Sequence, residues 1–84
     1  MSEKTKPKRA AEEVVKLKAK GASKEEAQAA VLYAGQLADS SETSAGLRSL
    51  AAWYKDELSR NPNDVARRET LMEAWIAEAA RFTV

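Results

Sequence analysis

Hydrophobic residues recur every three or four positions along most of this chain, which is the spacing of one face of an α-helix. Turn-forming residues divide the pattern into four stretches, which predict helices over residues 8–20, 24–38, 45–60 and 62–82. No run alternates β-branched with polar residues, as a half-buried strand would. The sequence therefore predicts an all-α fold, a small bundle of about four short helices.

The predicted core is the set of residues on the apolar faces of these helices, and it is heaviest in the last two. Tyr54 and Trp75 lie on the main stripes, and we expect both to be buried. The full set comprises Ala10, Val14, Leu17, Gly21, Ala27, Ala30, Val31, Ala34, Leu37, Ala38, Leu47, Leu50, Ala51, Tyr54, Leu58, Val65, Leu71, Met72, Trp75, Ala79 and Phe82.

Local signals indicate where the helices begin and end. Ser23 and Glu26 have the spacing of a capping box, so Ser23 is the expected N-cap of the second helix. Gly21 suits the position that follows the last turn of the first helix. Asn61 and Pro62 suit the N-cap and first position of the fourth.

The length of 84 residues fits one domain. Seventeen of the hydrophobic residues are alanine, which favours helix but buries little area. A basic segment precedes the first stripe, so we expect a flexible tail over residues 1–7, followed by a single helical domain over residues 8–84. Close packing through small residues, or an oligomer, would supplement the small core.

Several chemistries lack their usual residues. The chain has no cysteine and no histidine, so thiolate chemistry and the commonest general base and metal ligand are missing. The carboxylate pairs, such as Glu69 and Glu73, have no histidine partner and fit solvated helix faces. We expect no enzyme activity, no metal or cofactor and no small-molecule substrate. No signal peptide or apolar membrane span is predicted, and the composition suits the cytoplasm.

The charge is distributed unevenly. Residues 1–24 carry eight Lys or Arg against three Glu, whereas residues 25–84 carry six against ten acidic residues. Such a basic arm favours nucleic acid or another anion as a partner, although it also fits a solubilising tail. The candidate contacts, including two arginines near the fourth helix start, are Lys6, Lys8, Arg9, Lys16, Lys18, Lys20, Lys24, Arg67 and Arg68.

Residues 14–34 invite comparison with a helix-turn-helix, because a glycine separates two helical stretches. Two features argue against it. Lys16 and Lys20 occupy positions before Gly21 where that motif has apolar residues, and Glu25 and Glu26 at the head of the next helix would face phosphates. DNA binding is therefore the alternative function, and an ordinary helical hairpin is the preferred structure.

Four large apolar residues fall off or at the edge of the stripes: Leu32, Tyr33, Trp53 and Ile76. Trp and Tyr are enriched at binding hot spots, so these residues are the candidate protein-binding patch; the competing interpretation is that they are core. The leading function is a small non-enzymatic helical protein of accessory or inhibitor type. It would bind another protein or a second copy of itself, as a homodimer.

Overall fold

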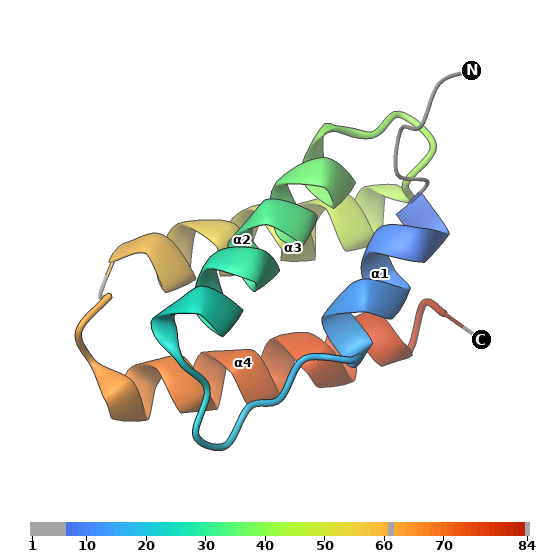
Figure 1. Ribbon diagram of the computed structural model, residues 1–84. Coiled ribbons are helices and arrows are strands. Elements are labelled where there is room, and N and C mark those ends of the chain that lie inside the picture. Colours follow the sequence, from blue (N-terminus) through green and yellow to red (C-terminus); the bar gives the residue numbers. More distant parts are fainter. Residues whose placement is uncertain (1–6, 61, 84) are drawn as a thin grey trace.

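The structure, a computed structural model, describes residues 7–60 and 62–83 and is all-helical in that part, with no strand. It confirms the bundle of four helices (Figure 1), which are α1 (Pro7–Val15), α2 (Lys24–Asp39), α3 (Ala45–Arg60) and α4 (Val65–Ala80). The predicted tail falls mainly on residues 1–6, which lie outside the described residues.

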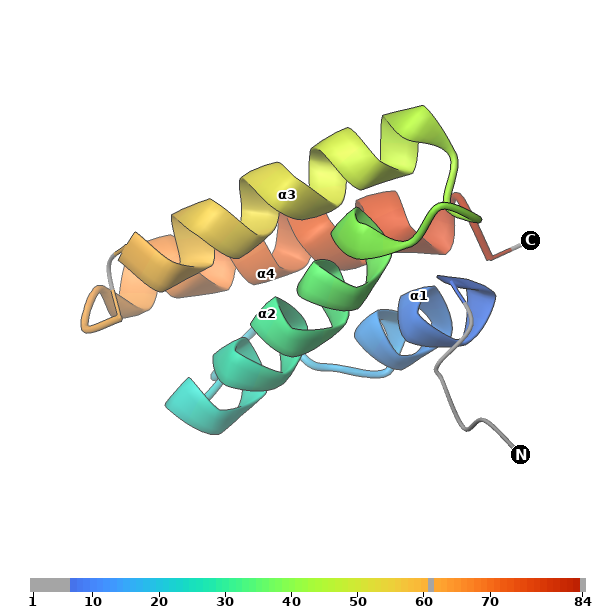
Figure 2. The same ribbon diagram turned by 90° about the horizontal axis from the view of Figure 1, so that it is seen from above.

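The four helices form two layers around one core. α3 and α4 pack against each other and run in opposite directions, and α2 lies alongside α3 at an angle (Figure 2). The contact between α2 and α3 is the largest, while α1 packs against both α2 and α4. The first helix therefore depends on the last helix for part of its packing.

The predicted N-cap of α2 is confirmed, whereas the predicted start of α4 is wrong. Ser23 Oγ accepts a hydrogen bond of 3.1 Å from the backbone N–H of Glu26. α4 begins three residues later than expected, and its N-cap is Asp64, which accepts a 3.0 Å bond from Arg67 N–H. Pro62 lies in a turn before this helix. The predicted cap Asn61 lies outside the described residues.

α1 ends at Val15, five residues before its predicted end. The amides of Lys16 and Leu17 close its last turn with bonds to the carbonyl groups three residues earlier. Gly21 follows as part of the turn that leads into α2, with a φ of +74°, and is not the cap of α1 as predicted. Residues 16–23 are therefore a loop, which runs along α4 (Figure 1).

Contacts with α4 explain why this loop is not helical. The Gly21 N–H donates a 2.8 Å bond to the carboxylate of Glu69, and Arg68 Nε donates a 3.0 Å bond to the carbonyl of Ala22. Leu17 and Ala19 pack against the core from the loop. A continued helix would carry these residues away from α4, so tertiary contacts override the helical propensity of the lysine-rich segment.

The core is built mainly as the stripes predicted. Trp75, Leu37, Met72 and Val14 are its largest fully buried side chains. Alanines from all four helices fill the spaces between them, among which Ala11, Ala30, Ala34, Ala51 and Ala79 are wholly inaccessible. Small residues at these positions let the helix axes approach closely. Val65 was predicted to be core but lies exposed in the first turn of α4.

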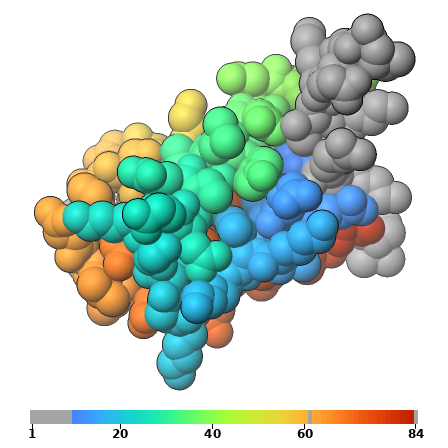
Figure 3. All heavy atoms as spheres, in the orientation of Figure 1, coloured from blue at the N-terminus to red at the C-terminus, as the bar shows by residue number. Residues whose placement is uncertain are grey.

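On the face of the molecule drawn in Figure 3, α2 and the loop before it lie in front of the later helices. None of the helices in residues 7–60 and 62–83 has both the length and the apolar character needed to cross a membrane.

Candidate functional site

The four residues of the predicted protein-binding patch differ in exposure. Leu32 is 58% exposed and Trp53 is 51% exposed. Tyr33 and Ile76 are half-buried and pack against the core. Two of the four residues therefore have the exposure that a binding surface needs.

Trp53 lies on the flank of α3 that faces α4. Its neighbour one helical turn later, Glu57, forms an ion pair of 2.6 Å with Arg67 of α4. Residues four apart share a helix face, so Trp53 lies on the same flank as Glu57. The side chain of Lys55, by contrast, lies beside Gly35 of α2, which places the opposite flank of α3 against α2.

Leu32 therefore lies away from Trp53. It precedes Gly35 by one turn on α2, and so belongs to the side of α2 that faces α3. Ile76 shares its face of α4 with Glu69, two turns earlier, which binds the loop through Gly21. Trp53, Leu32 and Ile76 of the predicted patch therefore lie on separate sides of the bundle.

The indole of Trp53 is supported by an aromatic stack. Its ring meets the ring of Tyr54 edge to face, with centroids 5.0 Å apart. Tyr54 in turn stacks on the fully buried Trp75 at 5.1 Å. Ser49, one turn before Trp53, and Gly46, two turns before it, are small and exposed, whereas Leu50 on the preceding turn packs against the core, and the indole stays 51% exposed. Trp53 is a half-exposed ring on a fixed base.

The predicted anion contacts also separate. Lys6 lies outside the described residues, and α1 carries Lys8 and Arg9. Lys16, Lys18 and Lys20 are exposed in the loop. Arg67 is paired with Glu57. Lys24 and Arg68, from different helices, come together at one pocket.

The segment 14–34 does not have the geometry of a helix-turn-helix. α1 ends at Val15 and α2 begins at Lys24, so the connection is about twice the three- to four-residue turn of that motif. Its lysines lie on the loop rather than on a recognition helix. Anion binding by the basic N-terminal segment stays a prediction, and it has no support from a helix-turn-helix.

The pocket that holds Lys24 and Arg68 has a volume of about 280 Å³ and opens between α2, α3 and the start of α4. One part of its lining is apolar. The buried side chains of Ala27 and Leu58 form its floor, and the half-buried Val31 continues the floor along α2. Pro62, from the turn before α4, completes the apolar part.

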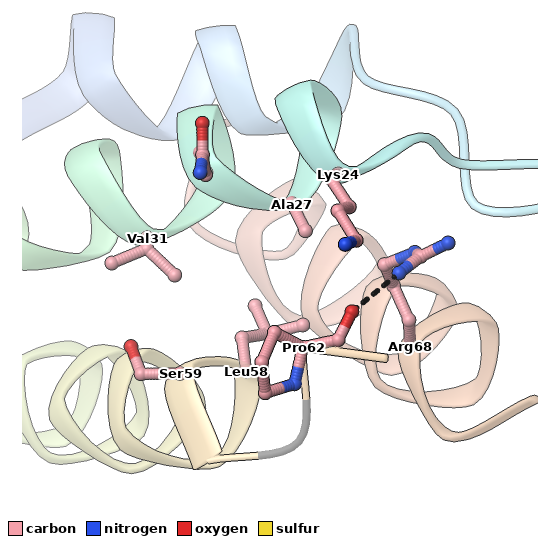
Figure 4. A pocket seen from close by; sticks show the side chains of 8 residues that line it. Lys24, Ala27, Val31, Leu58, Ser59, Pro62 and Arg68 are labelled. Atoms are coloured by element: carbon pink, nitrogen blue, oxygen red, sulfur yellow. Dashed lines mark hydrogen bonds between the residues drawn. The ribbon is translucent and has the colours of Figure 1, made fainter. Parts of the chain in front are cut away.

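The other part of the lining is polar and positively charged. The Lys24 ammonium and the Arg68 guanidinium lie beside each other at one end of the pocket (Figure 4). Arg68 is held in place, because Nε donates to Ala22 O and Nη1 donates a 2.9 Å bond to Pro62 O. Gln28 and Ser59 are the remaining lining residues, and none of the described lining residues is acidic.

The sequence pattern alone does not predict this pocket. It identifies Lys24 and Arg68 as cations, but it predicts that Ala27, Val31 and Leu58 belong to the core. The signal that was available is the placement of Ala27 at the start and Leu58 at the end of their apolar stripes. The separation of the start of α2 from the end of α3 (Figure 2) leaves a pocket above these buried residues.

The acidic residues show no metal-binding arrangement. Glu69 and Glu73 line a second, smaller hollow beside Lys20, but one oxygen of Glu69 already accepts the Gly21 N–H. Among the described residues, no group of three or more Asp or Glu side chains is placed to hold a metal ion. Burial raises the pKa of the Tyr54 phenol, and the Glu78 carboxylate adds to the rise.

Comparison of the chain with models of protein families, with curated proteins and with solved structures found no match. The functional assignment therefore rests on the geometry of two surfaces, the one around Trp53 and the pocket beside Lys24 and Arg68.

Proposed function

We propose that this chain is a non-enzymatic helical protein, of accessory or inhibitor type, that acts by binding another protein through Trp53. The observation that carries the proposal is the half-exposed indole of Trp53 resting on the Tyr54–Trp75 stack. A large aromatic ring whose position is already determined loses little conformational freedom on binding. Such residues dominate the free energy of many protein interfaces.

The surroundings of Trp53 support insertion into a partner. Gly46 and Ser49, on the same side of α3, are small and exposed, and Trp53 is the one large apolar side chain of α3 that is exposed. Glu57 and Arg67 on the other side are paired with each other and present little net charge. The partner surface that fits is an apolar pocket with a neutral rim, on another protein or on a second copy of this chain.

The test joins oligomeric state with site-specific cross-linking. Light scattering after size exclusion would give the mass of the wild-type protein and of Trp53→Ala. A photo-reactive phenylalanine would replace Trp53 in cells of the source organism, with the same group at the adjacent exposed Ala52 as the matched control. We expect one discrete cross-linked product from position 53 and none from position 52.

The purified partner then allows the affinity to be measured. Trp53→Ala should weaken binding by about thirtyfold, equivalent to ~2 kcal/mol, whereas Leu32→Ala should leave it unchanged because Leu32 lies on another side of the bundle. A protein that is monomeric at every concentration and forms no product from position 53 would refute the proposal.

A further inference from the structure

The pocket between α2, α3 and α4 has two chemically different ends. One end is apolar, formed by Ala27, Val31 and Leu58, and the other carries the cations of Lys24 and Arg68 (Figure 4). The volume of about 280 Å³ lies just below the range of pockets that enclose drug-sized ligands, which is about 300–1,000 Å³. The space suits one or two side chains better than a cofactor.

The charge of the pocket selects the sign of its ligand. Neither Lys24 nor Arg68 forms an ion pair within the described part of the chain, and the described lining has two cations and no acid. Two N–H groups of Arg68 donate hydrogen bonds to the carbonyl oxygens of Ala22 and Pro62. The other three N–H groups of its guanidinium are left for a further acceptor. An anion between the two side chains would relieve their mutual repulsion.

We infer that this pocket binds a short segment of a partner protein in which an aliphatic side chain lies next to an Asp or Glu. The aliphatic group fills the floor over Val31 and Leu58, and the carboxylate binds Lys24 and Arg68. A nucleotide fits less well, since the described lining offers no aromatic ring for a base to stack on. The pocket lies on the α2 side of α3, so this inference is independent of the surface around Trp53.

Selection from a library of displayed random dodecapeptides on the immobilised full-length protein tests the inference. Parallel selections use Lys24→Gln, which removes one cation, and Gln28→Glu, which adds a carboxylate to the lining with almost no change of shape. Lys18→Gln is the matched control, because Lys18 is exposed and lies outside the pocket. Helical circular dichroism and thermal melting establish that each variant is folded.

We expect the peptides enriched on wild type and on Lys18→Gln to share an aliphatic residue beside Asp or Glu. The best of them, made synthetically, should bind about fivefold to tenfold more weakly to Lys24→Gln and Gln28→Glu, and equally well to Trp53→Ala. Replacing its acidic residue by the amide should have a similar effect. NMR titration should shift the signals of Val31, Leu58 and Ser59.

Three results would overturn the inference. The first is a selection with no aliphatic–acidic consensus, including one with no enrichment at all. The second is equal affinity for wild type and both pocket variants. The third is a wild-type protein whose self-association is abolished by Lys24→Gln, because the pocket would then be filled by a second copy of the chain. None of these three results would affect the cross-linking expected from position 53, so the pocket proposal and the Trp53 proposal can fail independently.

Discussion

The phenol ring of Tyr54 stacks on the indole of Trp75, with ring centroids 5.1 Å apart and ring planes 25° apart. This contact joins α3 to α4 at the centre of the core, since Trp75 is fully buried and Tyr54 is 7% exposed. Offset-stacked pairs of this kind contribute about 0.5–1.5 kcal/mol beyond the area they bury. The same stack supports Trp53 from below, so the core and the proposed binding residue share one set of rings.

The two tryptophans should respond differently to substitution. Trp75→Ala should lower the free energy of unfolding by about 3–5 kcal/mol, because it leaves a large cavity, and this approaches the whole stability of a small domain. Trp53→Ala removes a half-exposed ring and should cost less than about 1 kcal/mol. Urea unfolding followed by circular dichroism measures both. Equal losses would contradict the assignment of Trp53 to the surface.

Alkaline pH should destabilise the protein through Tyr54. Burial, with a smaller contribution from Glu78, raises the pKa of its phenol above the ordinary 10.0. Between the pKa of the unfolded chain and the higher folded pKa, the unfolded state binds fewer protons, so the free energy of unfolding falls as the pH rises. Below pH 10 this effect vanishes.

Tyr54→Phe removes this ionisation and should lose less stability than wild type as the pH rises above about 10. Urea unfolding at a series of pH values gives the two curves, with Tyr33→Phe as the matched tyrosine control. Parallel curves for wild type and Tyr54→Phe would show that the fold does not oppose ionisation of this phenol.

Glu57 and Arg67 form an ion pair between α3 and α4, at 2.6 Å with the Glu57 side chain 18% exposed. A double-mutant cycle with Glu57→Ala and Arg67→Ala should give a coupling free energy of about 0.5–1 kcal/mol that decreases in high salt. The exposed pair of Asp56 with Arg60 within α3 is the comparison, and should give less. The prediction fails if the coupling between helices is zero at low salt.

Two glycines should respond to alanine with opposite signs. Gly21 has a φ of +74°, where a Cβ costs about 1–2 kcal/mol, so Gly21→Ala should destabilise the fold. Gly46 lies in α3 with no atom within 4 Å of an added Cβ, so Gly46→Ala should stabilise it by about 0.5–1 kcal/mol. Thermal melting of both variants checks the pair. A stabilising Gly21→Ala would contradict the left-handed backbone at Gly21, and a destabilising Gly46→Ala would contradict the open space beside Gly46.

Local signals predicted most of the fold, and they failed where distant residues decide the backbone. The bounds of α3 and the cap at Ser23 follow from periodicity and hydrogen-bonding side chains. The end of α1 does not, because Lys16 to Lys20 are good helix formers and only the contacts of Gly21 and Ala22 with α4 stop the helix.

The candidate surfaces were predictable to a smaller degree. Helix phase separated Trp53 from Tyr54 correctly, since the two faces of α3 on which they lie differ in burial. Helix phase could not show that Leu32 of α2 and Trp53 of α3 lie on different sides of the bundle, because their relative position depends on how three helices pack. The pocket has the same origin: Lys24 and Arg68 are 44 positions apart along the chain, and their meeting depends on packing rather than on sequence spacing.

The bonds from Glu69 and Arg68 to the loop before α2 bear on how the chain matures during synthesis. A nine-residue helix such as α1 is unstable alone, and its packing surface is completed by α4, which is made after α2 and α3. On the ribosome, α2 and α3 can pair as soon as both have emerged, but α1 must wait for α4. Of these four helices, the one that is made first should therefore be the last to reach its native place.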